Sequence, residues 1–251
     1  MRRNARAPSK SCETWCEAEA VSERIGRPAG LKFTKIEKRF GSLYALRRLD
    51  LEIAPGECVA LTGRNGSGKT TLLRVASQLT RPTRGDLSFP GLQEGAVPAI
   101  GYVAHAIMLY EELTAEENLR LFARLLGIAE PRRRALELLE SANLATRATS
   151  LVRTFSRGMK QRLAIARALL NDPGVLLLDE PATGLDTESM VWLTNRIRGL
   201  RDQGRTIIMS VHGESALSQL ATRAARLDAG TLVADTRGGA TFQSVFAMGE
   251  A

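Results

Sequence analysis

Cysteine, aromatic side chains and long apolar runs are all scarce in this chain of 251 residues. Its three cysteines, Cys12, Cys16 and Cys58, are too few for a disulfide framework in a chain of this size. Cys12 and Cys16 also lack a second pair or nearby histidines at zinc-ligand spacing, so a metal site there is not expected. We therefore expect a reducing, cytoplasmic environment.

Apolar runs long enough to cross a membrane are missing as well. The longest run, at residues 174–178, has the length of a strand, whereas a spanning helix needs roughly 18 consecutive apolar residues. The basic first residues are not followed by the apolar core of a signal peptide. We expect a protein that is soluble by itself and that reaches a membrane only through a partner.

Acidic residues are fewer than basic ones, and the net charge of +8 gives a pI near 9.9. Such a charge suits a nucleic-acid partner, an anionic membrane surface or simply a chain that prefers arginine. Arginine is spread over the whole sequence, and aromatic residues, at 5%, offer few rings for base stacking. These features favour the third interpretation, and we expect no direct contact with nucleic acid.

Apolar residues make up 44% of the chain, far more than in a disordered protein, and its length suits one packed α/β domain. Residues 1–30 lack periodicity and are predicted to be a flexible extension, and residues 241–251 a C-terminal tail. Strands that alternate with helices predict a mostly parallel sheet covered on both faces, beside an antiparallel part. The predicted strands are 31–36, 49–53, 58–62, short segments within 86–104, 174–178, 206–210 and a hairpin at 225–235; the predicted helices are 69–77, 115–126, 132–142, 158–170, 187–203 and 214–222.

The strongest motif is the glycine-rich run GRNGSGKT at residues 63–70, which matches G-x-x-x-x-G-K-[ST] throughout. It follows an apolar strand and opens a helix. Glycines let backbone N–H groups curl around phosphate oxygens, and a helix N-terminus favours negative charge. We expect Lys69 to neutralise the β- and γ-phosphates and the Thr70 hydroxyl to ligate Mg²⁺. The predicted nucleotide-binding residues of this loop are Gly63, Asn65, Gly66, Ser67, Gly68, Lys69, Thr70 and Thr71.

A second motif is the apolar strand at 174–178, which ends in two carboxylates. A buried strand would place Asp179 beside the phosphate loop, where it can hold Mg²⁺ through its coordination shell. Glu180 would then face the water that attacks the γ-phosphate, as general base or as water-orienting group. A core strand followed by a solvated acidic turn is the alternative, which the upstream phosphate loop disfavours. ATP and Mg²⁺ are therefore the predicted ligands.

A third motif, FSRGMKQRL at residues 155–163, leads into a helical run. Here the sequence resembles the ATP-binding cassette (ABC) ATPases, because residues 155–159 stand where that family has its LSGGQ signature. The resemblance covers residues 31–235. Arg157, in place of a glycine, and Met159, in place of glutamine, depart from the signature.

This resemblance implies a P-loop NTPase core with an antiparallel β subdomain, in a domain at residues 31–240. A helical insert near 105–155 would contact the membrane partner. It also implies an ATP-dependent head-to-tail homodimer, in which Ser156 and Gly158 of one subunit contact the γ-phosphate bound by the other. The N-terminus of a helix suits such an anion site. A helix that Ser156 merely caps is the simpler alternative.

Four further site residues follow from the resemblance. Asp186 stands where the family has an aspartate that shapes the dimer interface, and His212 resembles the switch histidine that senses the γ-phosphate. Phe40 is the expected adenine-stacking ring, with Tyr44 as the alternative. His105 takes the place of the glutamine that in most of the family reaches Mg²⁺ and couples the site to the membrane partner. Its imidazole either keeps that role with altered chemistry or has lost it.

Three functions are compatible with these motifs: a transporter motor, a nucleic-acid or chromosome ATPase, and a nucleotide sensor that does not hydrolyse ATP. The interval between Lys69 and Asp179 holds no long heptad run, and the chain has one cassette, which disfavours the second function. Intact Lys69, Asp179, Glu180 and His212 disfavour the third. We therefore expect the ATP-hydrolysing subunit of an ABC transporter, bound peripherally to a separate integral membrane permease at the cytoplasmic face of the plasma (inner) membrane.

Within transporters, His105 together with residues 109–119 and 155–163 resembles the export-type, CcmA-like cassettes of haem exporters in cytochrome c maturation. The main alternative is the ATPase of a drug, lipid or polysaccharide exporter. Because such a cassette does not itself bind the cargo, its sequence leaves the choice open.

Overall fold

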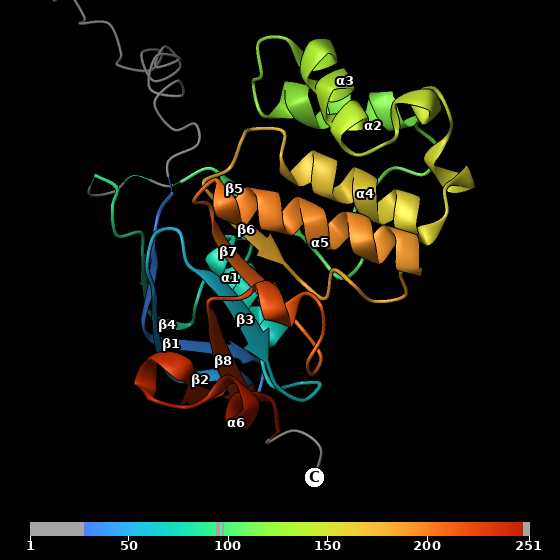
Figure 1. Ribbon diagram of the computed structural model, residues 1–251. Helices are drawn as coiled ribbons and strands as arrows, with labels where there is room; N and C mark the ends of the chain where they lie inside the picture. Colours follow the sequence, from blue (N-terminus) through green and yellow to red (C-terminus); the bar gives the residue numbers. More distant parts are fainter. Residues whose placement is uncertain (1–27, 94–95, 97, 248–251) are drawn as a thin grey trace, which may run out of the picture.

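A computed structural model gives the structure of residues 28–93, 96 and 98–247. The predicted extension lies almost wholly outside these residues, and so do Cys12 and Cys16. The described chain is an α/β structure with a mostly parallel sheet, an antiparallel sheet and helices packed around them (Figure 1). This arrangement confirms the predicted fold class.

The smaller sheet is antiparallel and has the strand order β2-β1-β4. Strands β1 (Leu31–Phe40) and β2 (Leu43–Ile53) form a hairpin, and β4 (Arg84–Ser88) pairs with the other edge of β1. The hairpin is longer than the predicted strands at 31–36 and 49–53. Its distal part is mostly exposed, so the alternation of buried and exposed residues that reveals a strand in the sequence fades there.

The larger sheet has six strands in the order β5-β6-β7-β3-β8-β9. Neighbouring strands from β5 to β8 run parallel, and β9 is antiparallel to β8. The carboxyl ends of five strands therefore lie at one edge, which is where such sheets carry ligand sites. The strands are β3 (Cys58–Thr62), β5 (Ile100–Val103), β6 (Val175–Leu178), β7 (Thr206–Ser210), β8 (Arg223–Asp228) and β9 (Thr231–Asp235).

Helix α1 packs between the two sheets, and the other long helices lie beyond the opposite face of the larger sheet (Figure 1). Helices α2 and α3 stand furthest from the antiparallel sheet and lie in the segment predicted as a helical insert. The first five helices agree with the predicted ranges to within two residues at each end. The helices are α1 (Lys69–Ala76), α2 (Ala115–Leu125), α3 (Pro131–Ser141), α4 (Arg157–Ala168), α5 (Thr187–Asp202) and α6 (Phe242–Ala247).

The central strands supply side chains to two separate cores. In β3, Val59 and Leu61 pack towards α1 and the smaller sheet, while Cys58 and Ala60 pack towards α4 and α5. Each fully buried leucine stabilises this arrangement by roughly 1.5–3 kcal/mol. Burial raises the pKa of the Cys58 thiol to about 12, so it stays protonated and acts as a core residue. The central strands are thus packed on both faces of the sheet, and the residues at their carboxyl ends are held rigidly.

The helix predicted at 214–222 is wrong, because the structure has only a 3₁₀ turn at Ser218–Leu220 there. Ser215 and Ser218 exchange side-chain to backbone hydrogen bonds, with Oγ accepting from the other residue's N–H at 2.7 and 3.2 Å. Such local bonds compete with helical ones. The Thr222 N–H then donates to the Cys58 carbonyl at 2.8 Å, which starts the pairing of β8 with β3.

The segment predicted as a C-terminal tail contains α6. Its Val245 and Phe246 are buried in the core that also holds α4 and α5. Phe242, Val245 and Phe246 have the i, i+3, i+4 spacing of a helix, but a segment of six residues is too short for that spacing to predict a helix. The described part of the tail is thus packed on the domain.

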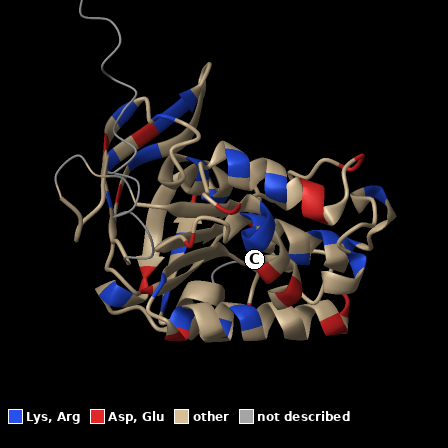
Figure 2. Cartoon of the chain, turned by 90° about the horizontal axis from the view of Figure 1, so that it is seen from above, with Lys and Arg blue, Asp and Glu red and all other residues tan. Residues whose placement is uncertain are grey.

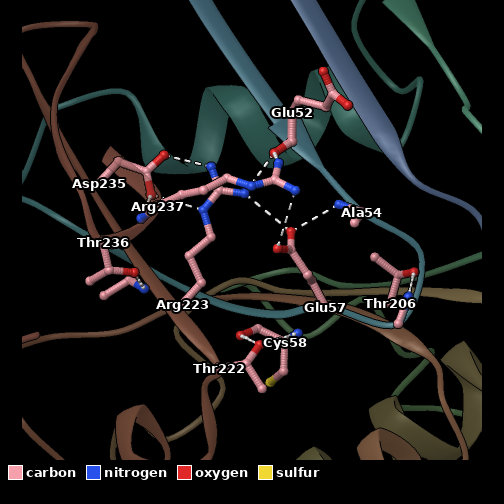
Figure 3. Close-up of polar contacts among 12 residues, drawn as sticks. Glu52, Ala54, Glu57, Cys58, Thr206, Thr222, Arg223, Asp235, Thr236 and Arg237 are labelled. Atoms are coloured by element: carbon pink, nitrogen blue, oxygen red, sulfur yellow. Dashed lines mark hydrogen bonds and ion pairs between the residues drawn. The ribbon is translucent and has the colours of Figure 1, made fainter. Parts of the chain in front are cut away.

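A buried arginine connects the two sheets (Figure 3). Arg223 of β8 donates to both carboxylate oxygens of Asp235 on β9, at 2.8 and 2.5 Å. It also donates to the Glu57 carboxylate at 3.1 Å and to the Glu52 carbonyl of β2 at 2.6 Å. Because the guanidinium fork satisfies acceptors on three segments, the β8–β9 hairpin is fixed against the antiparallel sheet.

Candidate functional site

The glycine-rich run at 63–70 forms the loop between β3 and α1, as the motif predicts. Gly68 has a φ of +106°, and a Cβ there would lie 2.7 Å from the Ala45 carbonyl oxygen, so glycine is required. Gly68 is also the N-cap of α1, which has no side-chain cap and no acidic residue in its first turn. The N–H groups of that turn can therefore bind an anion.

Lys69 lies in the mouth of this loop and is buried. Its ammonium donates to the carbonyls of Gly63 at 2.7 Å and Arg64 at 3.1 Å. Burial lowers the pKa of Lys69, while the charges of Glu180 and Asp179 oppose that shift. The ammonium is thus held by two loop carbonyls and feels the charge of both carboxylates, and an incoming phosphate would compete with those carbonyls for it.

The other loop residues surround this position. Asn65 and Gly66 are exposed at the tip, and Thr70 and Thr71 are half-buried in the first turn of α1. The Ser67 hydroxyl is buried and has no hydrogen-bond partner in the described part of the chain. An unsatisfied buried hydroxyl beside free N–H groups fits a site for a phosphate oxygen.

Asp179 follows β6 directly and is 1% exposed. Its Oδ1 accepts from the Ser210 hydroxyl at 2.8 Å, whereas Oδ2 has no partner among the described residues. A buried carboxylate oxygen without a partner fits a hard cation such as Mg²⁺. The described residues contain no cluster of three or more His, Cys, Asp or Glu side chains that could hold a metal. Phosphate oxygens and the Thr70 hydroxyl would therefore have to complete the shell.

Glu180 is fixed through both its backbone and its side chain. Its φ of +50° is unusual for a residue with a side chain, and its N–H donates to the Ser210 hydroxyl at 2.7 Å. One carboxylate oxygen, Oε1, lies 2.8 Å from His212 Nε2. The other, Oε2, lies 3.2 Å from His105 Nδ1. The structure thus brings both histidines of the chain onto one carboxylate.

Ser210 is a site residue that the sequence reasoning missed. Its hydroxyl joins Asp179 to Glu180, since it donates to the first and accepts from the second. The available signal was its place at the end of β7, next to β6 in the sheet. Reading that signal requires the strand order, which the motifs alone do not give.

The predicted signature residues lie together at the N-termini of α4 and α5. Ser156 caps α4 by accepting from the Met159 N–H at 3.2 Å, so the simpler capping role is present. Asp186 caps α5 by accepting from the Ser189 N–H at 2.8 Å, a bond that lowers the pKa of Asp186. A Cβ on Gly158 would collide with the Ser189 side chain, so glycine lets the two helix ends approach.

Arg157, which departs from the family signature, has a definite contact. Its Nε donates to the Thr183 carbonyl at 2.7 Å, and its side chain packs over Gly184. The arginine therefore ties the signature segment to the loop that leads to Asp186. Sequence reasoning recorded this residue as a departure and missed the contact.

The two candidate adenine-stacking rings sit near the turn of the β1–β2 hairpin. Phe40 is half exposed, with the Lys38 ammonium 5.1 Å from its ring centroid. Tyr44 is less exposed, and the guanidinium groups of Arg39 and Arg47 lie 4.9 and 5.5 Å from its centroid. Phe40 therefore offers the more open ring.

Comparison with known proteins shows to which family this chain belongs. The family described as "ABC transporter" matches residues 46–183, more than half of the chain. The chain belongs to the ABC transporter family. It is accordingly an ATP-binding and ATP-hydrolysing subunit of that family, and the loop at 63–70 with Asp179 and Glu180 is its candidate nucleotide site.

Relatives of this ABC ATPase include two named Nod factor export ATP-binding protein I. The one from Cupriavidus metallidurans is 38% identical over 212 residues, which cover 82% of this chain and 70% of that protein. The one from Burkholderia pseudomallei is 37% identical over 214 residues, with the same coverage. The predicted membership of the haem-exporter group is therefore not confirmed.

Among solved structures, a dimeric ATP-binding cassette, MJ0796, in a post-hydrolysis state with ADP and Pi has a similar fold. It is 29% identical with a TM-score of 0.73, and the match covers 82% of this chain and 97% of that one. A second dimeric structure of the same cassette gives the same values. None of the helices in the described residues is long and apolar enough to span a bilayer.

Proposed function

We propose that this ABC ATPase powers export through a separate membrane permease. The observation that carries the proposal is the group Lys69, Asp179 and Glu180 beside a phosphate loop, in a chain whose relatives bear export names. Of the cargoes considered, a drug, lipid or polysaccharide is compatible with relatives named for Nod factor export. Haem export in cytochrome c maturation has no support from those relatives.

The residues of the loop would bind the triphosphate. The N–H groups around Gly66 and Gly68 would donate to phosphate oxygens, and Lys69 would exchange its two carbonyl partners for the β- and γ-phosphates. Thr70 and Asp179 would hold Mg²⁺, which would neutralise charge on the phosphates. The unpartnered Asp179 Oδ2 supports this assignment.

Glu180 would orient the attacking water and accept its proton. Its carboxylate is fixed by His212, whose ring is half exposed and would sense the γ-phosphate. Positioning of this kind supplies most of the catalysis in phosphoryl transfer, since the phosphate itself needs little covalent help.

Phe40 would stack on adenine, because its ring is more exposed than that of Tyr44 and has one cation over it where Tyr44 has two. Such a contact would contribute on the order of 1 kcal/mol to binding.

A second copy of the chain would complete the site. Ser156 and Gly158 lie at the N-terminus of α4, and Asp186 lies beside them. In a head-to-tail dimer they would bind the γ-phosphate held by the partner's loop. The dimeric state of the similar cassette supports this arrangement.

The permease would contact the helical insert near residues 105–155. Met108 and Tyr110 are 53% and 51% exposed on the segment that follows His105, and they give this surface an apolar character. We place the protein peripherally on the cytoplasmic face of the plasma (inner) membrane, held there by the permease.

Nucleic acid is not proposed as a partner. Lys and Arg residues lie on strands and helices throughout the described chain and do not gather in one stripe (Figure 2). A stripe of that kind would be the footprint of a phosphate backbone.

Purification from membranes tests the proposal. The tagged full chain, expressed in its own cells, should copurify with one integral membrane protein, and the complex should turn over ATP in liposomes. Met108→Asp should lower the yield of that complex at least tenfold. The control is Val233→Asp, which changes an exposed valine on β9, at the opposite edge of the large sheet from β5. Failure of the unmodified chain to bring down any membrane protein would contradict the proposal.

A further inference from the structure

Three neighbouring strands are each followed by a residue of one contact: His105 and His212 both contact the carboxylate of Glu180. Strands β5, β6 and β7 are parallel and adjacent, with Val103 opposite Leu178 and Leu178 opposite Met209. His105 and Glu180 each lie two residues beyond these paired positions, on adjacent strands. The register alone therefore puts the two side chains next to each other.

His105 contacts the carboxylate oxygen of Glu180 that His212 does not contact. His105 Nδ1 lies 3.2 Å from Glu180 Oε2, and His212 Nε2 lies 2.8 Å from Oε1. Within the described chain, the only other side-chain hydrogen bond to that carboxylate is a long one, 3.5 Å, from the Thr183 hydroxyl to Oε2. Two imidazoles, one at each oxygen, therefore restrict rotation of the carboxylate about its last bond.

The backbone that carries His105 is itself held in place. Arg167 of α4 donates to the carbonyl of Tyr102 at 3.3 Å and to that of Met108, so it brackets His105 on both sides. Its guanidinium also lies 5.0 Å from the centroid of the Phe122 ring on α2. Asp179 N–H donates to the Val103 carbonyl at 2.9 Å, which fixes the segments before His105 and Glu180 to each other.

We propose that His105 is a positioning residue for Glu180, holding Oε2 while His212 holds Oε1. The inference rests on the role proposed above for Glu180 in orienting water. A carboxylate held at both oxygens keeps one orientation towards the attacking water, and loss of one contact lets it rotate. This role differs from that of the glutamine for which His105 stands, because it acts through the carboxylate and not through Mg²⁺.

Two replacements separate these roles. The amide nitrogen of asparagine takes about the place of Nδ1, the atom that contacts Glu180, whereas that of glutamine reaches the place of Nε2. A positioning role therefore predicts that His105→Asn keeps function and His105→Gln does not. A role on Mg²⁺ predicts the reverse, since glutamine is the residue that the family uses there.

The experiment measures kcat and KM for ATP hydrolysis by the full-length chain. We expect His105→Ala to lower kcat about 10- to 100-fold with KM changed by less than about threefold. His105→Asn should stay within about threefold of the unchanged chain, and His105→Gln should behave like His105→Ala. Unchanged kcat in His105→Ala, or rescue by glutamine and not by asparagine, would overturn the inference.

A double variant guards against an indirect effect on folding. In a Glu180→Gln background, His105→Ala should not lower the residual hydrolysis further, measured in a single turnover with the protein in excess over ATP, because the carboxylate on which it acts is gone. An equal loss in both backgrounds would overturn the inference. If Glu180→Gln alone turned over normally, the proposed role of Glu180 would fail; if it were inactive while His105→Ala stayed normal, only the present inference would fail. Export is tested separately, through the permease.

Discussion

At the scale of single residues, Glu180 has its backbone and its side chain fixed by different neighbours. Its N–H donates to Ser210, its φ is positive, and a histidine lies at each carboxylate oxygen. A left-handed backbone at a non-glycine residue costs on the order of 1 kcal/mol or more, so surrounding contacts must hold it. Strain of this kind commonly marks a residue whose orientation matters for chemistry.

We predict that Glu180→Gln keeps ATP binding and abolishes steady-state hydrolysis. Glutamine preserves the size of the side chain but cannot accept the proton of the attacking water, so turnover should fall by at least about 100-fold. Phosphate release and ATP titration on the same preparation measure the two properties. Glu140→Gln, a change to an exposed carboxylate on α3, is the control and should leave both unaltered. Normal turnover in Glu180→Gln would remove the assigned role.

The sequence predicted some of these single-residue features and not others. Lys69 and the pair Asp179 and Glu180 lie in runs whose local pattern identifies them. The contact of His105 with Glu180 could not be predicted, because β5 and β6 are neighbours in space while a helical insert separates them in the chain. The contacts of Arg167 could not be predicted either, because both carbonyls to which it donates lie far from it in the sequence.

At the scale of elements, the β8–β9 hairpin depends on the buried Arg223. Burial alone would raise the pKa of Asp235, but the hydrogen bonds and charges of Arg223 and Arg237 outweigh it and lower that pKa. A carboxyl whose folded pKa is depressed stabilises the fold above its unfolded value, near pH 4. This contribution is lost as the pH falls through the folded pKa.

We therefore predict that Asp235→Asn lowers the free energy of unfolding by about 2–3 kcal/mol at pH 7, because Arg223 loses a buried charged partner but keeps Glu57. Below about pH 4 the unchanged chain should lose this advantage, and the two proteins should converge. Urea unfolding at several pH values measures the difference. Asp228→Asn, at an exposed position of the same hairpin, is the control. Equal stability at pH 7 would contradict the importance of this ion pair.

Helices and strands with strong local signals were predicted well. Helix α2 begins at a capping box in which Thr114 and Glu117 exchange hydrogen bonds, and α3 begins at Pro131, so both starts are readable in the sequence. The helix expected at 214–222 failed because serine hydroxyls took over its backbone bonds. Local pattern thus decides an element only where no side chain competes for the backbone.

At the scale of the whole molecule, the site residues of the described chain form two groups. The loop at 63–70 lies with Asp179, Glu180 and both histidines, whereas Ser156, Gly158 and Asp186 gather at the ends of α4 and α5. The sequence resemblance predicted this division, and the two sheets follow from the alternation of strands and helices. The order of strands in the large sheet could not be predicted, because long-range pairing leaves no local period.

The most direct test of this account is the mass of the Glu180→Gln chain by light scattering, with and without Mg²⁺ and ATP. Without nucleotide we expect the monomer at 27.3 kDa, and with ATP twice that mass, because bound phosphate would bridge the loop of one copy to Ser156 of the other. Adding Ser156→Asp should abolish the dimer while keeping α4 folded, since aspartate is a good N-cap but repels phosphate. A mass that does not change with ATP, or a dimer that survives Ser156→Asp, would contradict a nucleotide site that a second copy of the chain completes.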